Sequence, residues 1–121
     1  MEKKNIIVEK SFEFALKIIE YAEELDKCKK YIISRQLFKS GTSIGANIRE
    51  AQSAESSADF VHKLKISAKE AEETEYWLLL CKHSKSYPPC DKLFSLLIEL
   101  QKLLSSIISS TKNNQKLRHM H

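Results

Sequence analysis

The residues that could do chemistry are few and scattered along the chain. A di-iron helical bundle needs Glu-x-x-His motifs on two helices, and no such set is present; Asp59 and His62 alone cannot complete a metal shell. His83 has serines nearby, but a catalytic triad is defined by geometry and not by adjacency in a helix. The segment from Gly41 to Gly45 lacks the Lys-Ser/Thr ending and the preceding strand of a phosphate-binding loop. We therefore expect no enzymatic activity, no metal site and no cofactor.

Three cysteines, Cys28, Cys81 and Cys90, are separated by 53 and 9 residues. An odd number at these spacings is neither a disulfide framework nor a zinc knuckle, so we expect buried or idle thiols in a reducing compartment. The first residues carry no signal-peptide pattern, and no stretch approaches the ~18 uninterrupted apolar residues of a membrane span. We expect a cytoplasmic protein with no membrane partner.

The pattern of apolar residues predicts four helices in a single domain. The chain has 121 residues with only two Gly and two Pro, which fits one helical core. The predicted helices span about 5–26, 31–54, 57–85 and 91–111, with a cap near Ser56 and Asp91 as the cap of the last helix. Short polar turns favour an all-α, antiparallel up-down-up-down four-helix bundle over residues 1–111. Residues 112–121 have no stripe to bury and are predicted to be a flexible basic tail.

The helix over 5–26 has two apolar faces. The face predicted to point inward consists of Val8, Phe12, Ala15, Ile19 and Ala22. The second face consists of Phe14, Ile18, Tyr21 and Leu25. One four-helix core is not expected to cover both, and a wide apolar surface usually marks association. The sequence therefore predicts a homo-oligomer.

Two glycines, Gly41 and Gly45, lie inside the helix over 31–54, where each costs about 1 kcal/mol relative to Ala. Together with Ser40, Ser43 and Ala46 they leave one surface almost without side chains. Something must pack closely there. A neighbouring helix of the same bundle and a helix of another subunit are both consistent with the sequence.

The positive charge is concentrated between residues 27 and 56, which hold six basic and two acidic residues. A surface of this kind attracts polyanions. The basic residues are Lys27, Lys29, Lys30, Arg35, Lys39 and Arg49, and they are the candidate nucleic-acid-binding residues. Lysines on a helix surface are also commonly just a solvated face, and the sequence contains no RNA-recognition signature.

Charged residues on the helix over 57–85 suggest structural roles. Asp59 and Lys63, and likewise Lys69 and Glu73, are four residues apart and can pair along the helix. A second interpretation joins helices or subunits: the acids Glu70, Glu73 and Glu75, with Lys63 and Lys69, would reach Asn47, Arg49 and Glu50 and fix the register. Trp77 is expected to anchor the core or an interface and not to stack on a base.

An ordered series of residues, densest between positions 36 and 80, matches a known family pattern. It includes Thr42, Ser43, Ile44, Gly45, Ala46, Asn47, Ile48, Glu50, Ala51, Asp59, Phe60, Lys63, Leu64, Ile66, Lys69, Glu70, Ala71, Glu73, Thr74, Tyr76, Trp77 and Leu78. In these residues the chain resembles the bacterial four-helix-bundle proteins first met in intervening sequences of 23S ribosomal RNA genes, which are similar to the accessory protein of diversity-generating retroelements. The resemblance implies a pentamer of four-helix bundles, no established catalytic activity, and a suspected nucleic-acid-binding role.

Two function classes remain open. The first is a nucleic-acid-binding accessory protein that handles structured RNA, DNA or a hybrid through the basic surface. The second is a protein-protein interaction scaffold whose assembly presents apolar or acidic surfaces to a protein partner. The placement of the charges discriminates between them, because a contiguous basic face favours the first class and basic residues scattered among acids favour the second.

Overall fold

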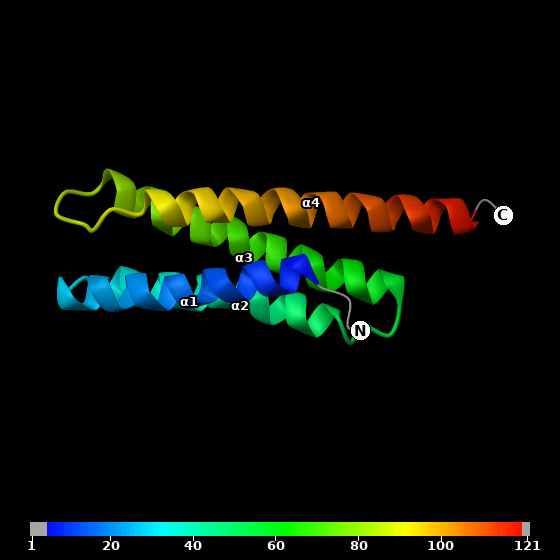
Figure 1. The fold of residues 1–121 in the computed structure, drawn as a ribbon, viewed down its shortest axis with the longest axis horizontal. Coiled ribbons are helices and arrows are strands. Elements are labelled where there is room, and N and C mark those ends of the chain that lie inside the picture. Colours follow the sequence, from blue (N-terminus) through cyan, green and yellow to red (C-terminus); the bar gives the residue numbers. More distant parts are fainter. Residues whose placement is uncertain (1–4, 120–121) are drawn as a thin grey trace.

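The computed structural model describes residues 5–119. It contains four helices: α1 (Ile6–Lys27), α2 (Tyr31–Ala51), α3 (Ser57–His83) and α4 (Asp91–His119). Consecutive helices run in opposite directions along the long axis of the molecule, so that both α1 and α3 are flanked by antiparallel neighbours (Figure 1). The predicted all-α four-helix bundle is confirmed.

Local hydrogen bonds explain where the helices begin and end. The Asn5 side chain caps α1, and the Ser56 hydroxyl accepts from the backbone N–H of Asp59 at 3.0 Å, which confirms the predicted cap of α3. Asp91 is the first residue of α4 and places a carboxylate in its first turn, where the helix dipole favours it, but it is not the cap. The second helix ends at Ala51, three residues before the predicted end, because the next bonds are of the tighter i to i−3 type.

The end of α4 differs from the prediction. The helix was expected to end near residue 111, but it continues to His119 and projects past the other three helices (Figure 1). The segment after Thr111 contains good helix formers such as Lys, Gln and Leu and no Gly or Pro to stop it. A missing apolar stripe shows only that this segment is not buried, and the described side chains from 112 to 118 are indeed mostly exposed. Residues 120–121 lie outside the described part.

The core-facing side of α1 differs from the prediction: the second apolar face is buried, whereas of the face expected inside only Ala22 is buried and Val8 packs against the core. Phe14, Ile18 and Leu25 are fully buried in the core. Phe12, which was expected inside, is 57% exposed, and Ile19 is only half-buried. Both faces have helical spacing, so spacing alone could not choose between them. The choice follows from the packing against α2, since Ile18 fills the space that Gly41 leaves open.

Gly41 and Gly45 are the places where α2 approaches α1 most closely. A Cβ atom at Gly41 would lie 2.8–2.9 Å from three side-chain carbons of Ile18, and a Cβ atom at Gly45 would lie 3.2 Å from the backbone oxygen of Ser11. Both contacts are within one chain. The glycines are therefore explained by a neighbouring helix of the same bundle, and they give no support to a contact with another subunit.

Buried hydroxyl groups continue this close packing. The Ser34 hydroxyl donates to the Ala22 carbonyl of α1 at 2.9 Å, and the Ser67 hydroxyl of α3 donates to the Ile44 carbonyl of α2 at 2.8 Å. The hydroxyls of Thr74 and Ser40 lie 2.9 Å apart between α3 and α2. Each small side chain allows the backbones to approach and satisfies its own polar group, as a buried polar group must.

The last helix carries more apolar surface than the bundle buries. By length and composition alone α4 is the one helix within residues 5–119 that could cross a membrane, and only 22% of its apolar window is buried. Serines, Glu99 and Lys102 interrupt the window, so it contains no unbroken apolar run. Leu97 and Leu100 are buried in the core, and Glu99 forms an ion pair with Lys10 of α1 at 3.4 Å. In this fold α4 is thus a helix of the bundle.

We expect Gly41→Ala to lower the free energy of unfolding by about 1–3 kcal/mol, because the added methyl group overlaps with the enclosed Ile18 and the cost of overpacking exceeds the gain in helix propensity. Urea unfolding followed by circular dichroism measures the change. The matched control is Ala46→Gly at an exposed position of α2, which reports the propensity difference alone. Stabilisation of the Gly41→Ala variant would contradict the close approach.

Candidate nucleic-acid interface

Two turns that are far apart in the sequence meet at one end of the bundle. The turn between α1 and α2 and the loop between α3 and α4 both lie at the left end in Figure 1. The Tyr21 hydroxyl of α1 donates to the Pro88 carbonyl at 2.6 Å, and the Lys30 ammonium lies 4.9 Å from the centre of the Tyr87 ring. The second distance is typical of a cation–π contact. These contacts join the two turns directly.

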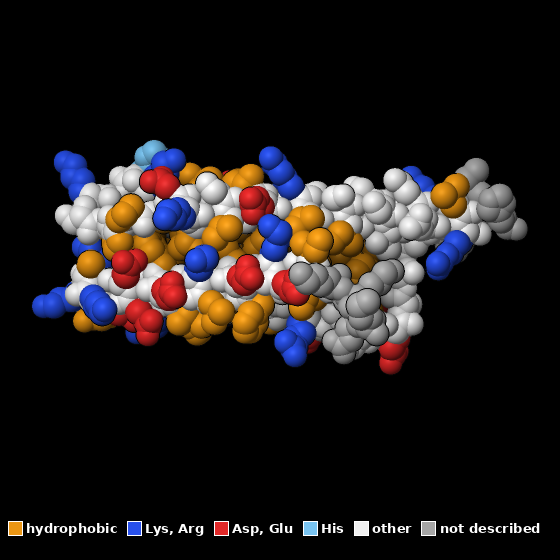
Figure 2. Space-filling view, viewed as in Figure 1, with side chains coloured by type: hydrophobic (Ala, Val, Ile, Leu, Met, Phe, Trp, Pro, Cys, Tyr) orange, Lys and Arg blue, Asp and Glu red, His pale blue; other side chains and the backbone are white. Residues whose placement is uncertain are grey.

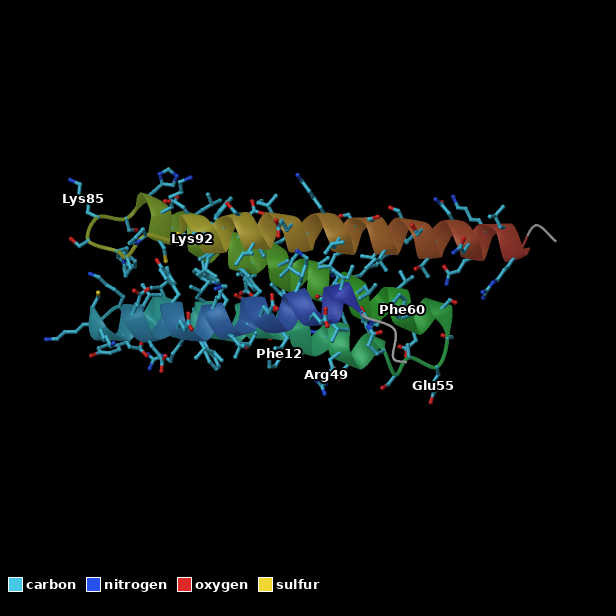
Figure 3. The ribbon with its side chains drawn as sticks, viewed as in Figure 1. Phe12, Arg49, Glu55, Phe60, Lys85 and Lys92 are labelled. Atoms are coloured by element: carbon cyan, nitrogen blue, oxygen red, sulfur yellow. The ribbon has the colours of Figure 1, made fainter. Side chains whose placement is uncertain are left out.

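Six lysines surround this end, which we call the basic end. It comprises residues 24–31 and 82–92, and these segments hold three carboxylates, Glu24, Asp26 and Asp91. The six lysines are Lys27, Lys29, Lys30, Lys82, Lys85 and Lys92. Lys85 projects from the end of the molecule in Figure 3, away from the helices. The first three candidate lysines are neighbours in the sequence, and the fold places the segment that carries Lys82, Lys85 and Lys92 beside them.

The turn after α1 holds Lys29 in an unusual conformation. Its φ angle is +62°, in the left-handed region where glycine is strongly preferred. The N–H groups of Lys29 and Lys30 donate to the carbonyls of Asp26 and Leu25 at 2.9 and 2.8 Å, which is the Schellman arrangement at a helix C-terminus. A lysine at this position therefore costs stability relative to a glycine.

The other three basic candidates lie elsewhere. Arg35, Lys39 and Arg49 are exposed along the solvent side of α2, at spacings of four and ten residues. They form a row that runs away from the basic end toward the far end of α2. The six residues predicted as one surface near this helix are therefore divided into an end cluster and a row.

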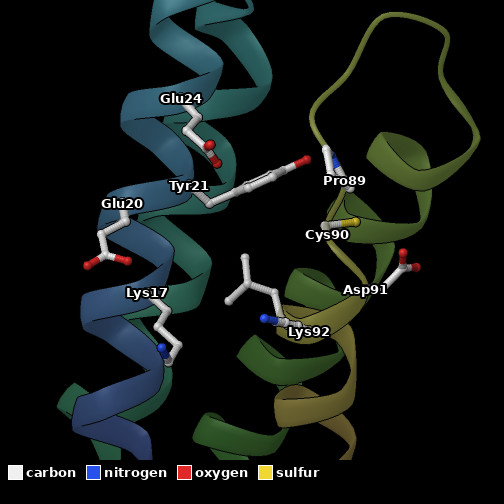
Figure 4. Close-up of a pocket in the computed structure, with 9 residues that line it drawn as sticks. Lys17, Glu20, Tyr21, Glu24, Pro89, Cys90, Asp91 and Lys92 are labelled. Carbon is white, nitrogen blue, oxygen red and sulfur yellow. The ribbon is translucent and has the colours of Figure 1, made fainter.

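A hollow of about 430 Å³ adjoins the basic end between α1 and the start of α4 (Figure 4). It is lined by Lys17, Glu20, Tyr21, Glu24, Pro89, Cys90, Asp91, Lys92 and Leu93. Three carboxylates against two lysines make this hollow unsuitable for a phosphate group, because like charges would oppose it. Phosphate contacts are better placed on the outer lysines of the basic end.

The floor of this end is buried and unreactive. Cys81 and Cys90 are buried, and burial raises the pKa of the Cys81 thiol to about 11 and that of Cys90 above its usual value. Both thiols are protonated at neutral pH and are poor nucleophiles. Burial is the main cause that raises the pKa of the Tyr21 phenol, and the neighbouring Cys81 and Cys90 raise it further. Cys28 is exposed in the turn. Within residues 5–119 no group of three His, Cys, Asp or Glu side chains is placed to hold a metal ion.

The charged residues of α3 were predicted to contact α2, but within residues 5–119 they form no ion pair with it. Among the described residues the single ion pair is the one between Lys10 and Glu99, so neither Asp59 with Lys63 nor Lys69 with Glu73 is paired. Glu75 accepts from Gln101 of α4 at 2.9 Å and so faces α4, not α2.

The α2 residues that were expected to contact these acids either bond within their own helix or are exposed to solvent. The Asn47 side chain donates to the Ser43 carbonyl of its own helix at 2.9 Å, and Glu50 is exposed. Glu70 is half-buried; burial and then Glu73 raise the pKa of its carboxyl, while Lys39 lowers it. Lys39 of α2 thus lies close enough to Glu70 to favour its charged form.

Trp77, which was predicted to anchor the core or an interface, is partly buried on α3. It packs against the core and makes an edge-to-face contact with Tyr76, with ring centres 5.4 Å apart. Its indole N–H is buried and has no hydrogen-bond partner among the described residues. Trp77 lies outside the two segments that form the basic end.

The three additional lysines could have been inferred from the topology. An up-down-up-down bundle places its first and third connections at the same end, so the loop around Lys85 must lie beside the turn around Lys29. Counting charge along stretches of the chain does not reveal this, because the two connections are more than fifty residues apart. The left-handed conformation at Lys29 leaves no signal in the sequence, because the residue that signals it would be glycine.

We expect Lys29→Gly to raise the free energy of unfolding by about 0.5–1 kcal/mol, because glycine adopts the left-handed conformation without strain. Thermal and urea unfolding measure this change. Lys27→Gly, two residues earlier at the last position of α1, is the control and should instead destabilise. Equal effects of the two substitutions would contradict the strain at Lys29.

Tyr21→Phe is expected to change how stability depends on alkaline pH. The folded-state pKa of Tyr21 lies above the unfolded value of 10.0, so the stabilisation from the neutral phenol is complete below about pH 10 and is lost as the pH rises further. The variant also loses the hydrogen bond to Pro88, worth about 1 kcal/mol. The advantage of the wild type in unfolding free energy should therefore shrink, and then change sign, between about pH 9.5 and 11.5. Parallel curves over this range would show that Tyr21 ionises equally in both states.

Comparisons with known proteins agree with this architecture. The sequence profile described as 23S rRNA-intervening sequence protein matches residues 3–106. A solved structure from Bacteroides thetaiotaomicron, described as a protein of unknown function from the S23 ribosomal protein family, is 45% identical, with a TM-score of 0.81; the match covers 84% of this chain and 97% of that one. A comparison with curated proteins found no match. The chain belongs to the 23S rRNA-intervening sequence protein family.

Proposed function

We propose that this protein is a non-enzymatic accessory protein that binds nucleic acid through the phosphate backbone, using the basic end of the bundle. The observation that carries the proposal is the meeting of two lysine-bearing turns, which gathers Lys29 and Lys30 with Lys82 and Lys85. Segments more than fifty residues apart thus contribute to one positively charged surface. Such a surface attracts polyanions and releases their counterions on binding.

The conformation of Lys29 supports this interpretation. Strained backbone positions persist where the surrounding structure enforces them, and they are concentrated at functional sites. The Schellman hydrogen bonds enforce the turn here, and a lysine occupies the position at which glycine would be more stable. Beside it, Tyr31 is 51% exposed at the start of α2. An exposed aromatic ring among lysines can stack on an unpaired base.

The type of binding follows from what the surface contains. Lysines contact phosphates as point charges and carry no base specificity, so we expect binding to depend on the shape and charge of the nucleic acid and not on its sequence. Structured RNA, DNA and RNA–DNA hybrids all present such a backbone. With six lysines and three carboxylates the affinity of one subunit should be modest. Several copies in a homo-oligomer, for which the family resemblance favours a pentamer, would raise it by avidity.

The alternative is a protein-protein interaction scaffold without nucleic-acid binding. It is supported by the apolar side chains of Tyr76 and Leu80 on α3, which are 57% and 38% exposed. In either case we expect the protein to act in the cytoplasm. The two functions differ in what they predict for RNA affinity: the first predicts that it falls when the basic end loses its charge, and the second predicts that the wild-type protein does not bind RNA.

The test is a double charge reversal with one lysine from each turn, Lys29→Glu with Lys85→Glu. Fluorescence anisotropy with a labelled RNA hairpin at low salt should show affinity lower by at least about tenfold, because two phosphate contacts are replaced by repulsion. The matched control, Lys69→Glu with Lys102→Glu, changes the net charge equally at exposed positions outside the basic end.

Equal losses in the two variants would show that only the net charge matters and would overturn the assignment to the basic end. No binding by the wild-type protein would leave the scaffold function.

A further inference from the structure

An apolar strip runs along the outer side of the α1–α2 pair. Phe12 and Leu16 of α1 are 57% and 48% exposed, and Phe38 of α2 is 46% exposed. Phe12 points away from the bundle in Figure 3. A groove of about 450 Å³ continues the strip between the helices and is lined by Ile19, Ala22, Glu23, Asp26, Ser34, Arg35 and Phe38. Exposed aromatic and aliphatic side chains that adjoin a groove are typical of a surface that another molecule covers.

Opposite charges border the two sides of this strip. On α1, acidic side chains spaced by four, seven and four residues form one row: Glu9, Glu13, Glu20 and Glu24. Figure 2 shows acidic side chains along α1 with hydrophobic side chains beside them. On α2, the row of Arg35, Lys39 and Arg49 borders the other side. Neither Glu20 nor Arg35 takes part in an ion pair within residues 5–119. The face is thus acidic along one edge, mainly apolar in the middle, where Glu23 and Asp26 also line the groove, and basic along the other edge.

From this arrangement we propose that the α1–α2 face is where two copies of this chain meet, with the acidic row of α1 in one copy against the basic row of α2 in the next. Charge complementarity identifies the occupant, because the face itself supplies both halves of the match. The apolar strip would be buried between the rows, as in the core of an interface, and the charges would form its rim.

The charges also fix the relative orientation of the copies. When the copies are related by an axis parallel to the helices, the acidic edge of one lies on the basic edge of the other. When the axis is perpendicular to the helices and lies in the face, acid meets acid and base meets base, which is repulsive. A parallel axis is compatible with a two-fold pair and with a ring, and in both cases each residue keeps its level along the axis.

Contacts within one chain show which residues of α1 and α2 lie at the same height along the helix axis. The Gly45 position lies against the Ser11 backbone, and Ser34 donates to Ala22. Residues near 20–22 of α1 are therefore level with residues near 34–36 of α2. Because a parallel axis preserves these levels, Glu20 of one copy should lie opposite Arg35 of the next.

The first test is the mass in solution, measured by sedimentation velocity at micromolar concentration. The wild-type protein should sediment as a multiple of the 14.0-kDa chain, and Phe12→Ser with Leu16→Ser should sediment as a single chain. The control, Tyr76→Ser with Leu80→Ser, removes an exposed apolar pair of equal spacing from α3 and should sediment like the wild type. A monomeric wild-type protein, or loss of the assembly in the control alone, would overturn the proposal.

The second test exchanges the charges. Glu20→Arg and Arg35→Glu should each raise the dissociation constant of the assembly about tenfold or more, and the double variant should restore it to within about threefold of wild type. Glu72→Arg on the exposed side of α3 is the control and should have no effect. Absence of rescue in the double variant would overturn the pairing. Neither Glu20 nor Arg35 belongs to the basic end, so this inference stands or falls separately from nucleic-acid binding.

Discussion

The close approach of α2 to α1 at Gly41 and Gly45 is the constraint on which the rest of the structure depends. With no side chain at these positions, Ile18 packs directly over the backbone of α2, and this contact selects which face of α1 enters the core. Phe12 and Leu16 then necessarily face outward, beside Phe38 of α2. The same packing, completed by the buried hydroxyls of Ser34, Ser67 and Thr74, aligns the helices along their length. One steric requirement thus determines both the core and the surface left for a partner.

The alternation of helix direction has a second consequence, at the ends of the bundle. It brings the turn after α1 and the loop before α4 together, where Tyr21 binds Pro88 and Lys30 lies over Tyr87. If copies assemble about an axis parallel to the helices, their basic ends all lie at the same rim of the assembly, whereas an antiparallel arrangement would separate them. The proposed contact between copies and the proposed binding surface are therefore physically connected: the first would multiply the charge of the second without adding a residue.

The fold could be predicted from the sequence because its signals are local. Apolar periodicity, the cap at Ser56 and the prolines before α4 mark where helices begin and end. The face of α1 could not be predicted, since Phe12 and Phe14 have equally regular spacing and the choice depends on Gly41 thirty residues away. The end of α4 was missed because burial was taken as a condition for helix formation, although Lys116 and Leu117 are helical while exposed. Of the candidate site, Lys27, Lys29 and Lys30 were found as a run of charge, and Lys82 and Lys85 required the topology as well.

The measurement that tests the central claim most directly is sedimentation of the wild-type protein with structured RNA and with duplex DNA at low and moderate salt. Lysine contacts to phosphates predict that the protein co-sediments with nucleic acid at low salt and is released as the salt concentration rises, because the bound counterions return to the backbone. Co-sedimentation that does not change with salt would contradict an interface of lysines. A protein that sediments alone even at low salt would contradict nucleic-acid binding and leave protein partners as the object of search.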